Sequence, residues 1–215
     1  MTNDETEERL IVSHLTLRRV VGILGVALPV ILALWGFALC ECIELQNSIS
    51  DYYGLRTRDA LVGILFAIGW FLFAYRGYGL GDSIAGYLAC LFALGAALFP
   101  NSSGDEWQRV VHFTSAVMLF LVLSYFALFL FTKSNEPRES WTDQKKLRNR
   151  IYVACGAVML ACIVLIGLYF GLLKDTAVSD IKPVFWLESL VLWTFGISWF
   201  VKGQTLWKDV EVYPK

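Results

Sequence analysis

The chain has 215 residues, of which 57% are hydrophobic and 17% are charged, and its formal net charge is −1. These charged residues are too few to cover the surface of a water-soluble domain, and a net charge this close to zero gives no indication of a nucleic-acid or acidic partner. The composition therefore excludes a soluble domain. It predicts an all-α membrane protein surrounded by membrane lipids, with no nucleic-acid partner.

Six apolar segments meet or approach the roughly 20 residues that a helix needs to cross a bilayer. They predict a polytopic bundle of six transmembrane helices, formed by a single domain over residues 1–215 and preceded by a short polar tail over 1–15. The predicted helices cover about 16–40, 58–75, 84–100, 110–132, 151–173 and 183–201.

Local features refine these segments. The first apolar run, 20–40, is longer than the core of a signal peptide, so we expect an uncleaved helix. Pro29 is predicted to kink this helix, and Pro100 to end the third one. The five cysteines, Cys40 and Cys42 among them, form no disulfide framework and no CxxC zinc pattern.

Lysine and arginine set the expected orientation, because they accumulate on the cytoplasmic side of membrane proteins. With six helices, 13 of the 18 fall on the side that holds both termini, and six of those 13 lie in the basic segment 133–150. The sequence therefore predicts cytoplasmic N and C termini, in what we expect to be a bacterial inner (plasma) membrane.

The ionisable residues near the apolar segments share one membrane depth. Glu188 lies about a turn and a half into the sixth segment, and His112 lies in the first turn of the fourth. Asp59 is expected to cap the second helix, and Ser50 and Asp51 precede it in the same loop. Because a charge at mid-membrane costs roughly 2.5–3.5 kcal/mol, we expect these residues to gather around one pocket on the extracytoplasmic side.

Two interpretations of these residues stay open. In the functional one, His112 exchanges a proton near neutral pH while Glu188 and Asp51 assist it, which makes these three the candidate catalytic residues. In the structural one, His112 is an interfacial residue, Glu188 binds a neighbouring helix, and Asp59 is a helix cap.

Binding or processing of a membrane lipid or its headgroup is the function that the shared depth favours. Arg58 is expected to pair with a lipid phosphate or with a carboxylate. Ser50, Asp59 and Tyr52 are the other predicted ligand-binding residues. The alternatives are a small-solute or ion transporter, or a non-catalytic sensor or scaffold that docks a cytoplasmic protein on the basic segment 133–150. A homo-oligomer also stays open.

Other chemistries have less support. A serine hydrolase built from Ser50, His112 and Glu188 would lack the GxSxG elbow. A single histidine on the side of the carboxylates is too little for zinc. The sequence therefore predicts no metal and no cofactor.

Three short motifs carry a family resemblance. They are Ile49-Ser50-Asp51 before the second helix, HFTSAV from His112 in the fourth, and LESLVLW around Glu188 in the sixth. Together with Gly63 in the second helix they resemble the DRAM/FRAG group, which are six-helix eukaryotic membrane proteins that include autophagy modulators and proteins of GPI-anchor lipid remodelling. The resemblance implies a protein that acts on or senses lipids from the outer membrane face.

A second likeness covers residues 48–132 best. The pattern SISxYY, then RD, then glycine and a later histidine is similar to six-helix prokaryotic membrane proteins of a domain-of-unknown-function type. It implies the same six-helix plan and brings no activity with it.

The predicted orientation has a direct test. A reporter enzyme that is active only in the cytoplasm should be active when it is fused to the C-terminus, because the positive charges hold that side inside. Activity of a periplasm-specific reporter at the same position would contradict the orientation.

Overall fold

All regular structure in the described part of the chain is helical. The computed structural model describes residues 3–39, 44–77, 79–102, 104–134 and 137–204. The α-helices are α1 (Asn3–Leu39), α2 (Arg58–Ala74), α3 (Leu80–Leu98), α4 (Glu106–Tyr125), α5 (Asp143–Leu168) and α6 (Pro183–Lys202). Single π-helical turns, Phe126–Leu130 and Tyr169–Leu173, extend α4 and α5, and short 3-10 turns occupy Ser50–Gly54, Arg138–Ser140 and Ala177–Ile181.

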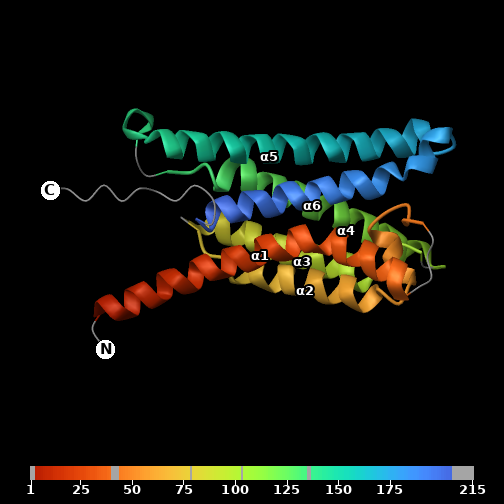
Figure 1. Cartoon of the computed structure of the whole chain (residues 1–215), viewed down its shortest axis with the longest axis horizontal. Coiled ribbons are helices and arrows are strands. Elements are labelled where there is room, and N and C mark those ends of the chain that lie inside the picture. Colours follow the sequence, from red (N-terminus) through yellow and green to blue (C-terminus); the bar gives the residue numbers. More distant parts are fainter. Residues whose placement is uncertain (1–2, 40–43, 78, 103, 135–136, 205–215) are drawn as a thin grey trace.

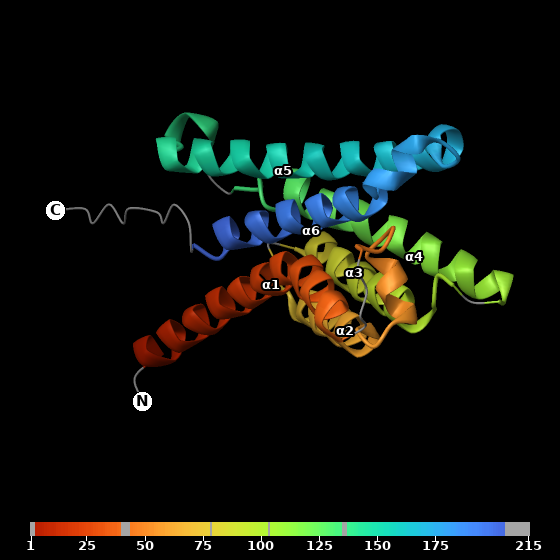
Figure 2. The same ribbon diagram turned by 45° about the vertical axis from the view of Figure 1, so that its right-hand side comes forward.

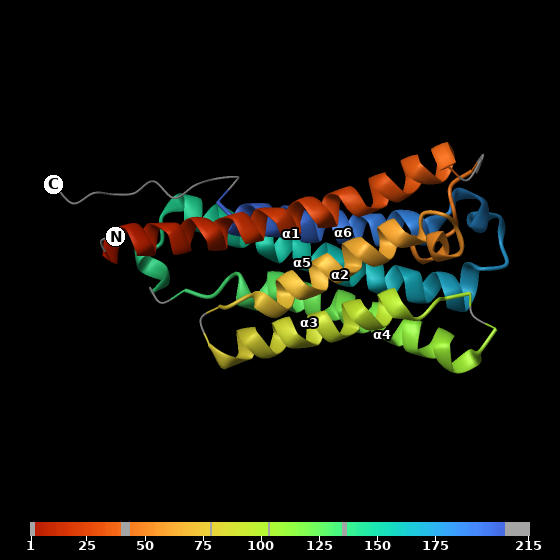
Figure 3. The ribbon, with the colours of Figure 1, turned by 90° about the horizontal axis from the view of Figure 1, so that it is seen from below.

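The six helices run roughly along one axis and form a closed ring. Each helix packs against the next in the chain, and α6 packs back against α1. The start of α1 and the end of α6 lie at the same end of the bundle, together with the α2–α3 and α4–α5 connections (Figures 1 and 3). We call this the basic end, and we call the other one, where α1 passes into α2, the capped end.

Within the part of the chain that the structure describes, five helices are long and apolar enough to cross a membrane, and α2, with 17 residues, is the exception. Large apolar side chains point outward from the bundle, for instance Leu34 at 65%, Leu91 at 61% and Val164 at 60% exposure. Such a surface suits hydrocarbon rather than water. At 1.5 Å per residue α2 spans about 25 Å, against a hydrocarbon core of about 30 Å.

The predicted helices agree with the observed ones to within a few residues, with two exceptions. The tail expected over 1–15 is helical from Asn3, so α1 is much longer than predicted, and α5 begins at Asp143 instead of 151. Pro29 lies inside α1, whereas α3 ends two residues before Pro100, as predicted. Cys40 and Cys42 lie outside the described residues.

Small residues allow the closest helix approach. A Cβ added to Gly196 of α6 would lie 2.7 Å from the carbonyl oxygen of Gly22 on α1, and one added to Gly22 would lie 3.0 Å from that of Gly196. No larger side chain fits there unless the backbones move apart. Close contact at small residues is a usual way to hold helices together in lipid, where apolar surface gives little reason to associate.

An aromatic cluster fills the bundle toward the basic end. Trp199 of α6 is fully buried, and its ring centroid lies 5.3 Å from those of Tyr75 and Phe131, 5.8 Å from Phe195 and 6.0 Å from Phe126. These rings come from α6 and from the ends of α2 and α4. Burying so many rings fixes the lateral arrangement of these helices.

Candidate functional site

The loop between α1 and α2 folds back over the helix ends at the capped end of the bundle (Figures 1 and 2). We call its described residues, 44–57, the loop cap. Tyr52 and Tyr53 are 1% and 8% exposed and belong to a hydrophobic cluster with residues of α1, α2, α3 and α6. A Cβ added to Gly36 would lie 2.7 Å from the Tyr52 ring, so this glycine allows the ring to pack directly on α1.

Glu188 holds the loop cap from α6. Its Oε2 accepts a hydrogen bond from the backbone N–H of Ile49 at 2.6 Å, and its carboxylate also faces the N–H of Ser50. One turn earlier in α6, the N–H of Phe185 donates to the carbonyl oxygen of Asn47 at 3.0 Å. The loop backbone and the start of α6 therefore satisfy each other's polar groups.

His112 holds the next loop residue from α4. The side chain is 2% exposed, and its Nδ1 lies 2.7 Å from the carbonyl oxygen of Phe99 while its Nε2 lies 2.9 Å from the Ser50 hydroxyl. A carbonyl oxygen can only accept, so Nδ1 carries the proton and donates. In the neutral ring Nε2 is then the acceptor, and the Ser50 hydroxyl donates to it.

Asp51 is tied to the connection between α3 and α4. Its Oδ1 accepts a hydrogen bond from the side-chain amide of Asn101 at 2.6 Å, and its N–H donates to the Ser48 hydroxyl at 3.1 Å. The buried Oδ1 of Asn101 has no hydrogen-bond partner within the described residues. An acceptor of this kind suits a water molecule or a donor group of a ligand.

Arg58 does not pair with a carboxylate through any contact of the described residues. Its guanidinium lies over the Tyr53 ring, 4.8 Å from the centroid, and donates to the Tyr53 hydroxyl at 3.2 Å. That hydroxyl donates in turn to the carbonyl oxygen of Leu98 at 3.2 Å. Arg58 is itself exposed, so most of its five N–H donors point away from these contacts.

Asp59 lies apart from the other candidates. The prediction that Asp59 caps α2 is wrong. Thr57 is the N-cap residue, and Asp59 lies in the first turn of the helix. Its side chain is exposed at an otherwise apolar groove of about 490 Å³ between α1 and α2. The groove is lined by Ile31, Leu34, Trp35, Asp59, Ala60, Gly63 and Ile64.

The structure thus divides the predicted site. Ser50, Asp51, His112 and Glu188 meet at the three consecutive residues 49–51. Arg58 instead contacts Tyr53, and Asp59 lines the separate groove between α1 and α2. Tyr52, predicted to bind a ligand, has its ring in the core instead. A Ser50–His112–Glu188 triad does not form, because the Phe99 carbonyl occupies the position of the acid and Glu188 binds backbone amides.

Three groups that form hydrogen bonds at this site were not predicted from the sequence. The carbonyl of Phe99 and the N–H of Ile49 are backbone groups, which no residue pattern identifies. Asn101 could have been predicted from the sequence, because it is a polar residue directly after Pro100 and lies at the same expected membrane depth as His112.

Comparisons of the chain with protein-family models, with curated proteins and with solved structures give no match. Among the described residues, no three His, Cys, Asp or Glu side chains are placed to hold a metal ion. What the site can do therefore has to follow from its own geometry.

Glu188 offers the first test of this geometry. In Glu188→Ala the amide of Ile49 loses its acceptor, which costs about 1–3 kcal/mol and favours release of the loop cap. Trypsin should then cleave the detergent-solubilised protein after Arg56 or Arg58 about tenfold faster, because cleavage follows the open population. Glu106→Ala, an exposed acidic residue at the same end, is the control. Equal cleavage of the two variants would contradict the role of Glu188.

Proposed function

We propose that this chain is an integral membrane protein of six spanning helices that binds a membrane phospholipid at its capped end. The groove between α1 and α2 is the observation that carries this proposal. Its lining is apolar apart from Asp59, and its neighbours Leu34 and Trp35 are 65% and 47% exposed. A groove of this composition at membrane depth is filled by lipid hydrocarbon, and the family resemblance described above also implies a lipid.

Asp59, which lines the groove, and Arg58, which precedes it in α2, favour a zwitterionic aminophospholipid. Arg58 is exposed with unused donors, and its planar fork matches a phosphate group. Asp59, the next residue, is an acceptor for an ammonium group. An acyl chain along Gly63 and Ile64 would place its headgroup at Asp59, one residue after Arg58 in α2.

The excess of lysine and arginine at the basic end supports a cytoplasmic location for both termini. On that orientation the capped end and its groove face the outer leaflet. The expected location is the bacterial inner membrane.

Transport through the bundle has less support. The mid-helix hydroxyls that such a path would use are buried and donate back to their own helices: Ser124 to Phe120 at 2.8 Å, Thr194 to Leu190 at 2.7 Å and Ser198 to Phe195 at 2.6 Å. Hydroxyls that bind their own backbone offer little to a hydrated solute.

Gly63 gives the sharpest test of lipid binding. A Cβ added there meets no atom within 4 Å, so Gly63→Leu should fill the groove without straining the fold. The purified variant should lose about one bound phospholipid per chain, as measured by mass spectrometry of extracted lipids.

Gly167→Leu is the matched control, because Gly167 is also an exposed helical glycine with open space around it. The control should keep the wild-type lipid content. Asp59→Asn should lower the share of aminophospholipid among the bound lipids and leave their total unchanged. Wild-type lipid content and composition in Gly63→Leu would refute the proposal.

The Ser50–His112 contact favours a second candidate function, acyl transfer from a lipid ester. A proton acceptor 2.9 Å from a serine hydroxyl, with its other nitrogen fixed by a carbonyl, has the arrangement of a nucleophile and its general base. Ser50 Oγ would attack the ester carbonyl while its proton passes to Nε2 of His112, and the lipid alcohol would leave with that proton.

A fluorophosphonate probe tests this second candidate. The Ser50 oxygen should bond to phosphorus and displace fluoride, so the wild type and Ser102→Ala should be labelled, whereas Ser50→Ala and His112→Ala should lose at least about 90% of the label. Ser102 is an exposed serine at the same end of the bundle. Equal labelling of all four proteins would show that Ser50 and His112 only hold the loop cap.

A further inference from the structure

Helix α5 lies at the outer edge of the bundle, where it packs against α4 and α6 (Figures 1 and 2). It is the least buried of the five described helices that can cross a membrane. In its most apolar stretch 28% of the residues are buried, against 39–61% in the other four. One long face of α5 is therefore turned toward the surroundings of the protein.

This face of α5 combines two cations with an apolar stripe, and we call it the outer face. Its exposed residues recur every three or four positions, as residues on one side of a helix do. In chain order they are Lys146, Arg150, Val153, Ala157, Ala161 and Val164. The opposite side of the helix, with Tyr152, Cys155 and Met159, is buried in the bundle. The two cations therefore lie in line with side chains that meet lipid.

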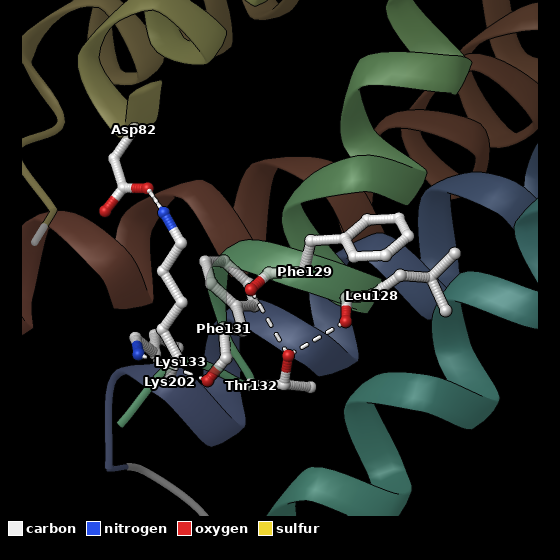
Figure 4. Close-up of polar contacts among 7 residues, drawn as sticks. All are labelled: Asp82, Leu128, Phe129, Phe131, Thr132, Lys133 and Lys202. Atoms are coloured by element: carbon white, nitrogen blue, oxygen red, sulfur yellow. Dashed lines mark hydrogen bonds and ion pairs between the residues drawn. The ribbon is translucent and has the colours of Figure 1, made fainter. Parts of the chain in front are cut away.

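Cations that face the bundle at this end have partners within the protein. Lys133, shortly after α4, is held by the fully buried carboxylate of Asp82 on α3, whose Oδ1 lies 2.5 Å from Lys133 Nζ (Figure 4). Lys202, at the end of α6, donates from Nζ to the carbonyl oxygen of Phe131 at 3.5 Å. These contacts fix the start of the connection that leads to α5.

The two cations of the outer face are in a different situation. Arg150 is exposed and makes no polar contact within the described residues. Lys146 lies 3.2 Å from the fully exposed carboxylate of Asp143, and surface pairs of this kind contribute little in water. Together the three side chains have one net positive charge.

Arg150 lies at the boundary between the polar and the apolar part of α5. The apolar run begins at residue 151, and the exposed Val153 follows within one turn. Lys146 lies one turn before Arg150, about 6 Å along the helix axis, so both long side chains can reach one phosphate group. The guanidinium fork matches two phosphate oxygens, while the aliphatic stems can lie on the apolar stripe.

We propose that the outer face of α5 binds a phospholipid with one net negative charge, of which phosphatidylglycerol is an example. Arg150 and Lys146 hold its phosphate, and one acyl chain lies along Val153, Ala157 and Ala161. The net positive charge at headgroup level favours an anionic lipid over a zwitterionic one. The positive-inside rule requires cations on one side of the membrane, but it does not require them to lie in line with an exposed apolar stripe.

This site is independent of the proposed function. The phosphate lies at the basic end on α5, whereas the groove between α1 and α2 belongs to the capped end. Loss of either site leaves the residues of the other in place, so the two can be tested separately.

Two double variants separate this site from general surface charge. The outer-face variant, Lys146→Gln with Arg150→Gln, removes both cations of the outer face. The control variant, Arg76→Gln with Arg138→Gln, removes two exposed cations from the α2–α3 and α4–α5 connections at the same end of the molecule. The two variants have equal net charge.

The experiment uses the purified full chain in phosphatidylcholine nanodiscs that contain a small share of a probe lipid with a photoreactive diazirine at the end of one acyl chain. The probe is phosphatidylglycerol in one arm and phosphatidylcholine in the other, and mass spectrometry of peptides locates the label. In the wild type and the control variant, the phosphatidylglycerol probe should label residues 151–168 more than the phosphatidylcholine probe does. In the outer-face variant this labelling should fall about tenfold or more. Added inorganic phosphate should leave it unchanged.

Four results would overturn the proposal. One is equal labelling of α5 by both probes in the wild type. A second is an equal loss of label in both double variants, which would mean general surface charge. A third is loss of label in the presence of inorganic phosphate, which would mean a soluble anion. The fourth is an α5 that neither probe labels, as expected where a second copy of the chain covers the face. If the outer-face variant does not fold, as judged by gel filtration, Arg150→Gln is compared with Arg138→Gln in the same way.

Discussion

The hydrogen bond between Glu188 and the backbone of Ile49 is the contact on which the capped end depends. An irregular loop at membrane depth has N–H and C=O groups that lipid cannot satisfy, so such a loop persists only where the protein supplies partners. Glu188 accepts from the N–H of Ile49, and the N–H of Phe185 donates to the carbonyl oxygen of Asn47. His112 and Asn101 bind the side chains of the next two loop residues, Ser50 and Asp51. Because they act on adjacent residues, the loop cap is held in one conformation and presents Ser50 to His112 in a fixed geometry.

The same loop also contributes to the core at the capped end. Residues 50–57 directly precede α2, and Tyr52 and Tyr53 belong to the apolar cluster there. The loop cap is therefore part of the bundle rather than an appendage, and its loss would remove core contacts as well as hydrogen bonds. Toward the basic end, the rings around Trp199 fill the core.

Apolar length and polar interruptions predicted much of this from the sequence. The six segments follow from runs of residues that lipid can solvate, and the common depth of Asp51, His112 and Glu188 follows from their positions within those runs. The hydrogen-bond partners of these three residues could not be predicted in the same way. Hydrophobic periodicity does not show which way the first residues of a helix face when a loop comes directly before them. The sequence therefore predicts Asp59 in the same pocket as His112 and Glu188, whereas the structure places it with Gly63 at the groove between α1 and α2.

The position of that groove determines how it can be supplied. It lies between α1 and α2, and the side chains of Leu34 and Trp35 that line it are exposed on the outside of the bundle. If the groove binds a lipid as proposed, that lipid reaches it by lateral diffusion within one leaflet and does not have to leave the bilayer. Occupancy would then follow the mole fraction of that lipid in the leaflet, so the protein would respond to membrane composition and not to any concentration in the surrounding water.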